Sequence, residues 1–360
     1  MQLGGAAGPR YSVMEELASL APISVNREAI RRVCVAFGPV ILSIETYGSA
    51  LGNVALDPLR HAALSRETAT DLHLVLIDGK DTGLDGKTIS DLVGNGDCTR
   101  HAGNGFNAGR PRLRANVDWN TYCLIEEEKR RIIVWFADAS AVPEWVVYDQ
   151  IRNALHWLSL GRGFGMFHAA ALRLGETGCL IAGKSGSGKS TFTAAAIAGD
   201  FCSAGDDFVL VETATFPPSV HAVFDTIKLD EDGLTRFPQF LPFVRNPARS
   251  RTEKSIFHMY DSAPDRIATG FPLHAILHAR LTGQRQSRIV KSGPSAAFLA
   301  LAPSSLLLLR TQSKDVSTKC ATLVGGLNCY IFEIGTNLEA AVDEFTVFMR
   351  DREQLLAPSI

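Results

Sequence analysis

One run of glycine, serine and lysine residues is the part of this sequence best suited to chemistry. The run comprises Gly183, Lys184, Ser185, Gly186, Ser187, Gly188, Lys189, Ser190 and Thr191. It fills the Walker A pattern GxxxxGK[ST] without a mismatch, between a segment typical of a strand and one typical of a helix. Glycines let successive backbone N–H groups turn around phosphate oxygens, and a helix N-terminus favours negative charge. We expect Lys189 to reach the β- and γ-phosphates of ATP and the Ser190 hydroxyl to bind Mg²⁺, for use in phosphoryl transfer.

Two adjacent carboxylates follow this phosphate loop. Asp206 and Asp207 lie 17 and 18 residues after Lys189 and precede the apolar segment FVLV. A phosphate loop normally works with a carboxylate that anchors magnesium or orients the nucleophile. We expect Asp206 to hold the metal with Ser190 and Asp207 to accept the proton of an attacking hydroxyl, and the residues leave the reverse assignment open. The alternative is that both aspartates only cap the entrance of a strand.

A histidine precedes the loop. His168 lies 15 residues before Gly183, in a segment expected to be the strand that pairs with the strand entering the loop. From such a strand its side chain could reach the aspartates. Taken alone, however, a histidine between Phe167 and three alanines is more often a buried core residue than a catalytic one.

A basic segment, RNPARSRTEK, lies in the second half of the chain. Its candidates for contact with phosphate or with a substrate carboxylate are Arg249, Arg251 and Lys254. The alternative is an ordinary solvated loop.

The composition indicates a folded chain without a general charge bias. Its 360 residues suffice for two domains, and 46% hydrophobic with 21% charged residues is typical of globular proteins. A formal net charge of -2 supplies no general attraction to nucleic acid or anionic lipid, so we expect neither as a partner. The seven scattered cysteines, without a CxxC pair, indicate reduced thiols. No apolar run reaches the roughly 18 residues of a membrane span, and we expect a cytoplasmic protein.

Hydrophobic patterning predicts an α/β protein with an N-terminal α+β domain over residues 1–160 and a second domain, which holds the phosphate loop, over 161–360. In the first domain we expect a helix at 13–20, strands at 33–45 and 72–77, long loops over 78–114, a hairpin of 122–125 with 132–136, and a helix at 143–160. In the second we expect a hairpin of 167–174 with 178–182, helices at 191–198 and 337–349, and strands at 206–212, 274–281 and 297–309.

The histidine, the loop and the aspartate pair together resemble the HPr kinase/phosphorylase family, P-loop serine kinases that share a core with phosphoenolpyruvate carboxykinase. That family has a histidine opening a hairpin, the glycine loop at the hairpin's far end and an Asp-Asp pair behind the next helix, here His168, 183–190 and Asp206-Asp207. The resemblance covers roughly 167–212 well and the rest of the second half more loosely. It implies a P-loop kinase domain over 161–360, ATP and Mg as cofactors, and a His168 that supports the acid/base aspartate.

The later part of the chain is similar to smaller relatives of that family. TEKSIF with Lys254, Pro272-Leu273 before an apolar strand, and GTNLEAAVDEF look like the HPr-kinase-like proteins found beside peptide-modification genes, some of which phosphorylate a lasso peptide. The resemblance implies a substrate peptide or protein bearing a serine. For residues 1–160 we expect substrate recognition or oligomer contact, and a homo-oligomer is compatible with either.

Two other functions use the same loop. GKSGSGKST also occurs in the nucleotide-binding subunits of ABC-type transporters, but the chain has no LSGGQ-like signature and no apolar run ending in Asp-Glu at the usual place. A non-catalytic ATP-binding regulatory protein is the other alternative, and the aspartate pair would then be superfluous.

Overall fold

A computed structural model describes residues 27–66, 68–91, 112–116, 118–250, 252–309 and 313–356. The chain divides into two compact units between Leu158 and Ser159. The helix expected at 13–20 and much of the loop region expected over 78–114 lie outside the described residues. Among the residues that are described, none of the helices combines the length and the hydropathy that crossing a membrane requires.

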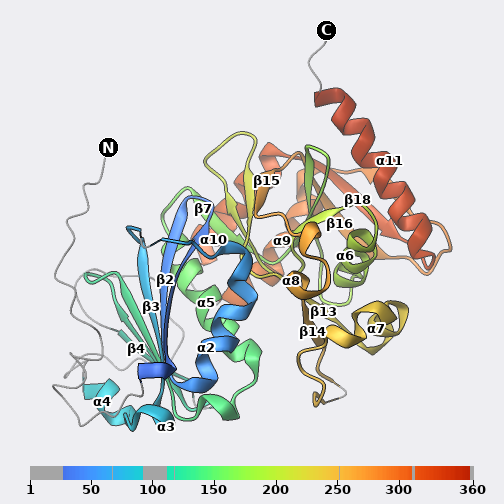
Figure 1. The fold of residues 1–360 in the computed structure, drawn as a ribbon. Helices are drawn as coiled ribbons and strands as arrows, with labels where there is room; N and C mark the ends of the chain where they lie inside the picture. Colours follow the sequence, from blue (N-terminus) through green and yellow to red (C-terminus); the bar gives the residue numbers. More distant parts are fainter. Residues whose placement is uncertain are drawn as a thin grey trace. The chain divides into compact units, whose positions relative to one another are not determined.

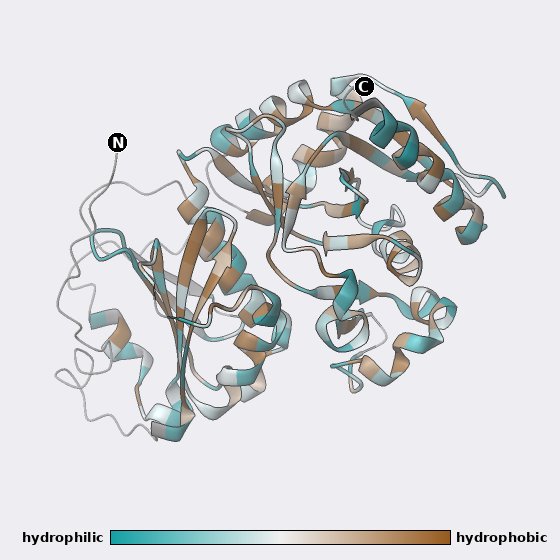
Figure 2. Cartoon of the chain, turned by 45° about the horizontal axis from the view of Figure 1, so that its top comes forward, coloured by the Kyte–Doolittle hydropathy of each residue, from teal (hydrophilic) through white to brown (hydrophobic). Residues whose placement is uncertain are grey.

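The first unit is a mixed six-stranded sheet with helices packed on it, in the strand order β1-β2-β3-β6-β5-β4 (Figure 1). Its elements are η1 (Arg27–Ala29), β1 (Ile30–Phe37), β2 (Val40–Tyr47), α2 (Ser49–Leu56), η2 (Asp57–Ala62), β3 (Leu72–Asp78), α3 (Gly79–Thr82), α4 (Gly86–Asp91), β4 (Arg112–Asn116), β5 (Thr121–Glu126), β6 (Arg131–Phe136), η3 (Ala139–Ala141) and α5 (Glu144–Ser159). Figure 2 shows hydrophobic residues concentrated on these strands, as a buried sheet requires.

The hairpin expected from 122–125 and 132–136 is confirmed, because β5 and β6 pair antiparallel. The single strand region expected over 33–45 is instead two antiparallel strands. Gly38 makes the turn between them with φ 59°, a conformation that a residue without a Cβ adopts at little cost. Two short helices, α3 and α4, lie within 78–91, where only loops were expected.

The second unit is organised around another six-stranded sheet, in the order β10-β8-β9-β16-β18-β17. Its elements are β7 (Phe164–Phe167), β8 (Ala170–Leu174), β9 (Thr177–Ala182), α6 (Lys189–Ala198), β10 (Cys202–Gly205), β11 (Val209–Glu212), β12 (Ser219–Ala222), β13 (Thr226–Leu229), α7 (Glu231–Arg236), η4 (Pro238–Phe243), β14 (Ser255–His258), α8 (Met259–Ser262), η5 (Pro264–Arg266), β15 (Gly270–Pro272), β16 (Ala275–Leu281), β17 (Arg288–Lys291), α9 (Pro294–Leu309), α10 (Ser313–Gly326), β18 (Asn328–Ile334) and α11 (Leu338–Leu356).

Alternation along the central strands divides the core of this unit into two layers. In β9, Cys179 and Ile181 face the layer that contains α6 and α11, whereas Leu180 and Ala182 face the layer that contains α9 and α10. The ring of Phe192 on α6 lies 5.2 Å from a phenylalanine ring of α11, edge to face. This packing fixes α6, and therefore the loop before it, against the sheet.

The segment 297–309 is a helix, so the strand expected there was wrong. It belongs to α9, which spans sixteen residues and includes Pro303. A short apolar run does not by itself distinguish a buried strand from a helix, but this run is longer than a typical strand and rich in alanine and leucine, which favour helix.

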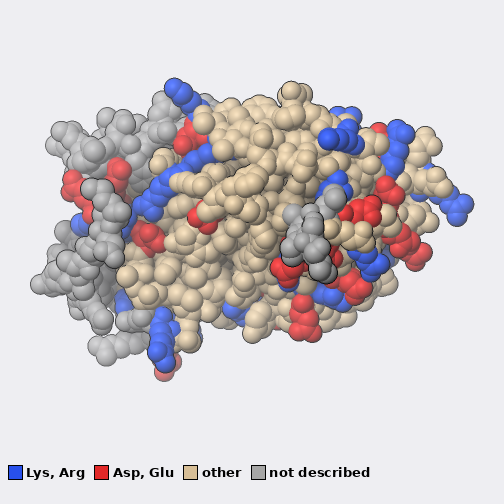
Figure 3. All heavy atoms as spheres, turned by 90° about the horizontal axis from the view of Figure 1, so that it is seen from above, with Lys and Arg blue, Asp and Glu red and all other residues tan. Residues whose placement is uncertain are grey.

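Two smaller sheets complete the unit: β15-β12-β11-β7, and a ribbon of β13 with β14. On the face shown in Figure 3, basic and acidic side chains lie among one another, with broad uncharged surface between them.

Candidate active site

The phosphate loop connects β9 to α6, as the pattern predicted. Gly186 and Gly188 have φ 76° and 89°, conformations that favour glycine. A Cβ added at Gly183 would lie 2.6 Å from Ser187 Oγ and 3.0 Å from Ala279 O, so only glycine fits there without displacement. The backbone conformation of the loop therefore depends on its own glycines. The loop leads into α6, which begins at Lys189.

Lys189 is turned back onto the loop. Its Nζ donates to Gly183 O at 2.7 Å and to Lys184 O at 3.3 Å, and the residue is only 6% exposed. Burial lowers the pKa of its ammonium from the ordinary value, although the nearby carboxylates of Asp207 and Asp206 oppose this shift.

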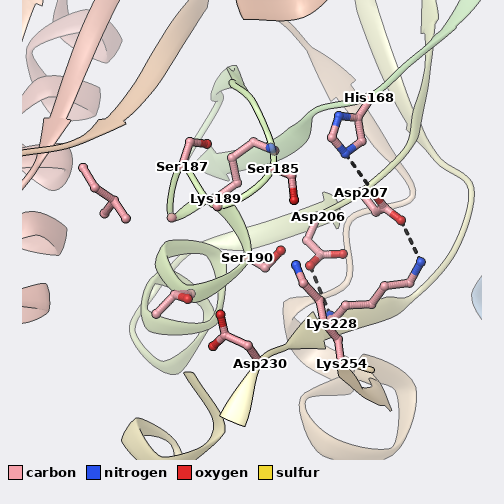
Figure 4. Close-up of a pocket in the computed structure, with 14 residues that line it drawn as sticks. His168, Ser185, Ser187, Lys189, Ser190, Asp206, Asp207, Lys228, Asp230 and Lys254 are labelled. Atoms are coloured by element: carbon pink, nitrogen blue, oxygen red, sulfur yellow. Dashed lines mark hydrogen bonds and ion pairs between the residues drawn. The ribbon is translucent and has the colours of Figure 1, made fainter. Parts of the chain in front are cut away.

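The aspartate pair lies at the same pocket, in the turn between β10 and β11 rather than on a strand that starts at 206. The pocket is lined by His168, Ser185, Gly186, Ser187, Gly188, Lys189, Ser190, Thr191, Asp206, Asp207, Lys228, Asp230, Lys254 and Leu281. The structure therefore brings together the phosphate loop, both aspartates and His168 (Figure 4).

Asp207 is held from both sides. His168 Nε2 lies 3.1 Å from its Oδ1, and Lys228 Nζ donates to its Oδ2 at 2.7 Å (Figure 4). Burial alone would raise the pKa of this carboxyl, but the Lys228 ammonium and the His168 imidazole outweigh it and hold the pKa well below its ordinary value. The side chain of Asp207 lines the pocket and is 30% exposed.

Asp206 is buried, at 2% exposure. Its Oδ2 accepts a hydrogen bond from the backbone N–H of Lys228 at 3.2 Å, whereas its buried Oδ1 has no hydrogen-bond partner among the described residues. Burial and the negative charge of Asp207 raise its pKa to about 6, and the backbone N–H and ammonium of Lys228 and the Ser190 hydroxyl work against that rise. The two neighbouring carboxylates are therefore shifted in opposite directions.

The residues around Asp206 fit a magnesium ion. Figure 4 shows the Ser190 hydroxyl pointing toward the Asp206 carboxylate, whose Oδ1 is the orphaned atom. A hydroxyl and a carboxylate are hard oxygen donors, and Mg²⁺ bound through one or two protein groups usually completes its shell with phosphate oxygens and water. Among the described residues there is no cluster of three or more His, Cys, Asp or Glu side chains suited to a metal.

His168 lies on the bend between β7 and β8, not on the strand itself, and β8 is the strand that pairs with β9. Its backbone N–H donates to Ser305 Oγ of α9 at 3.0 Å, and its ring lies 5.2 Å from that of Phe208. The side chain of His168 is therefore both packed against Phe208 and directed at Asp207.

Sequence reasoning missed two polar residues of the pocket, Lys228 and Asp230. Lys228 is on β13 and Asp230 follows that strand, where its side chain caps α7 by accepting from the backbone N–H of Gly233 at 2.8 Å. The sequence KLDED around them offered a signal only in its charges, and nothing near it in the chain points to phosphate.

The basic segment is divided by the structure. Lys254 lines the pocket, and Figure 4 shows its ammonium pointing toward Asp206. Arg249 is not a lining residue, and its guanidinium pairs with Glu231 at 2.8 Å. Arg251 lies outside the described residues.

Neither family models nor curated proteins gave a match to this sequence. Among solved structures, the chain is similar to the HPr(Ser) kinase/phosphatase from Coxiella burnetii. The similarity has 12% sequence identity and a TM-score of 0.30, and it covers 53% of this chain and 99% of that one. That enzyme is of the family that the motifs resemble, but a TM-score of 0.30 is too low to indicate a function for this chain. The function is therefore inferred from the geometry of the site.

Proposed function

We propose that this protein is an ATP- and Mg-dependent kinase that transfers the γ-phosphoryl group to a hydroxyl, with a serine of a peptide or protein as the acceptor. The observation that carries the proposal is the position of Asp207, which lines the same pocket as the phosphate loop and pairs with both His168 and Lys228. A site that only binds nucleotide does not need a carboxylate paired with a histidine and a lysine beside the phosphate loop.

The arrangement supports in-line transfer. The acceptor oxygen forms a bond to the γ-phosphorus while the bond between that phosphorus and the β,γ-bridging oxygen breaks, so that ADP leaves with the electron pair. Asp207 orients the hydroxyl and accepts its proton. A low pKa makes this carboxylate a weak base, but in a loose phosphoryl-transfer transition state the proton leaves late and orientation matters more.

The remaining groups of the pocket would bind the triphosphate and neutralise its charge. Lys189, the loop N–H groups and Lys254 line the pocket and would bind phosphate oxygens, and Ser190 with Asp206 would hold the metal. Bound Mg²⁺ would neutralise charge on the triphosphate. Lys228 lies next to Asp207 and keeps it ionised, so it keeps the proton acceptor ready.

The proposed acceptor is a serine, in a peptide of the lasso type or in a protein. This choice comes from the family that the motifs resemble. The partial exposure of Asp207 supports an acceptor that approaches from solvent, as a flexible chain would. The first unit is proposed to recognise that substrate or to make an oligomer contact.

The geometry favours a kinase over a transport ATPase. The parallel neighbour of β9 is β16, which ends at Leu281. The next strand, β18, is parallel to β16 and ends at Ile334. A transporter motor would carry its Asp-Glu pair at the end of such a parallel neighbour. Here Asp206 and Asp207 come instead from the β10–β11 turn. In the sheet, β10 and β16 lie on opposite sides of β9.

The test is incubation of the protein with γ-labelled ATP, Mg²⁺ and candidate serine peptides, including any short precursor peptide encoded beside its gene. We expect label in the peptide with the wild type, and none with Lys189→Ala or Asp207→Asn. ATP hydrolysis that labels no acceptor and is stimulated by a membrane protein would reject the kinase. Retained labelling in both Asp206→Asn and Asp207→Asn would remove the carboxylates from the mechanism.

A further inference from the structure

Leu281 is a feature of the pocket that phosphoryl transfer does not use. Its side chain is large, apolar and 58% exposed, whereas the other lining residues are charged, polar or glycine. An exposed leucine on an open surface has no special meaning. This one lies inside a polar pocket, at the carboxyl end of a parallel strand, where α/β sheets bind ligands.

The sheet order gives the direction of a bound nucleotide. In the order β10-β8-β9-β16, the aspartates follow β10, the phosphate loop follows β9 and Leu281 ends β16. The aspartates and Leu281 therefore lie on opposite sides of the loop. A triphosphate whose γ-phosphorus is at Asp207 and whose β-phosphate is in the loop directs its nucleoside toward Leu281.

Leu281 is also in contact range of the loop. A Cβ added at Gly188 would lie 2.8 Å from Leu281 Cδ2. Gly188 immediately precedes the first turn of α6, where Ser190 and Thr191 also line the pocket. The leucine therefore borders the end of the pocket at which the α-phosphate and the ribose would leave the loop.

The segment after Leu281 is held in place by hydrogen bonds to the end of β18. Thr282 N donates to Ile334 O at 3.1 Å, and Thr336 N donates to Gln284 O at 2.8 Å. Gly335 N donates to Ser287 Oγ at 2.9 Å. Such a fixed support lowers the entropy lost when a ligand packs on it.

We propose that Leu281 is the apolar contact for the nucleoside of the bound nucleotide. The inference rests on the proposed function, since the direction of the triphosphate is taken from Asp207 as the site of transfer. Leu281 would therefore contribute to the binding of ADP and ATP. Pyrophosphate lacks a nucleoside and would not make this contact.

The test is calorimetric titration of the full chain, in the presence of Mg²⁺, with ADP and separately with pyrophosphate. Leu281→Ser should weaken ADP binding about tenfold, because a half-exposed leucine loses its apolar contact, and should leave pyrophosphate binding within about twofold. Leu281→Met should retain the affinity of the wild type for ADP. Leu299→Ser is the matched control, because Leu299 is 68% exposed on α9 and does not line the pocket, and it should change neither affinity.

Two results would overturn the proposal: unchanged ADP binding in Leu281→Ser, or an equal loss of ADP and pyrophosphate binding, which would mean that the leucine only supports Gly188. These are distinct from failure of the proposed function. ADP binding that depends on Leu281 in a protein that phosphorylates no hydroxyl would reject the kinase and keep the nucleoside contact. A wild type that binds neither ligand would reject both.

Discussion

The phosphate loop and the β13–β14 ribbon both bring lysine side chains to one pocket, and they are built differently. The loop is contiguous in sequence, and its lysine is bonded to its own carbonyls. The ribbon is a separate two-stranded sheet: Lys228 is on β13 and Lys254 immediately precedes β14, so the pocket receives two lysines that the sequence separates widely. The difference teaches that the proposed phosphate-binding loop is encoded locally, whereas the surroundings of Asp207, the proposed proton acceptor, depend on tertiary structure.

The comparison is tested most strongly by removing one lysine from each region. Lys189→Ala should lower kcat/KM on the order of 1000-fold and weaken nucleotide binding, because the loop loses its cation. Lys228→Met should lower kcat on the order of 100-fold while ADP affinity changes less than about threefold, because Asp207 loses the partner that keeps it ionised and oriented. Steady-state kinetics with calorimetry measures both.

Lys228→Arg is the control for charge, and it should recover part of the kcat. The opposing result is that Lys228→Met weakens ADP binding as strongly as Lys189→Ala does. That result would contradict the assignment of nucleotide binding to the phosphate loop and of phosphoryl transfer to the β13–β14 ribbon.

Asp206 joins the two regions, and its replacement should stabilise the protein. Its pKa of about 6 lies above that of an unfolded aspartate, so its carboxylate destabilises the fold increasingly as the pH rises from the unfolded-state pKa to about 6, and fully above it. Asp206→Asn should raise the free energy of unfolding by about 2 kcal/mol at pH 8 without metal, and by little at pH 4, where the carboxyl is protonated. Denaturant unfolding at the two pH values measures this.

Asp207→Asn is the matched control with the opposite sign. The folded-state pKa of Asp207 is lowered, so its carboxylate stabilises the fold above the unfolded-state pKa, and this contribution is lost as the pH falls. The variant should be less stable than the wild type at pH 8. Equal effects of the two substitutions would contradict the opposite pKa shifts.

The smallest effect concerns how the ribbon places Lys254. Asn246 Nδ2 donates to Lys254 O at 2.9 Å, and Asn246 Oδ1 accepts from Ile256 N at 2.9 Å. Asn246→Ala should raise the KM for ATP about threefold to fivefold, because Lys254 is no longer held at the pocket. In a double-mutant cycle, Lys254→Ala should make the further change at Asn246 nearly silent. Additive effects would show that Asn246 acts elsewhere.

Much of the site could be predicted because its pattern is local. The loop needs glycine at positions whose backbone only glycine adopts or fits, and the aspartate pair and His168 stand at fixed intervals around it. The Walker A pattern therefore predicted the loop and α6, and a glycine-containing turn between two apolar segments predicted the hairpin that leads into it.

The rest of the site depended on packing that leaves no local pattern. In the sequence, Lys228 is an ordinary lysine in a short strand. Only the fold brings β13 to the β10–β11 turn, where the backbone N–H of Lys228 donates to Asp206. Arg249 was expected at the phosphates on charge alone, whereas the fold pairs it with Glu231. In the fold, α9 was missed because a uniformly apolar run has no period that separates helix from strand.

The bonds of Lys189 to Gly183 O and Lys184 O have a consequence for the thermodynamics of nucleotide binding. A lysine in solvent would have to shed its water when a phosphate arrives, whereas this one has already exchanged water for carbonyls. Its dehydration is therefore completed during folding, and binding only swaps one set of oxygen acceptors for another.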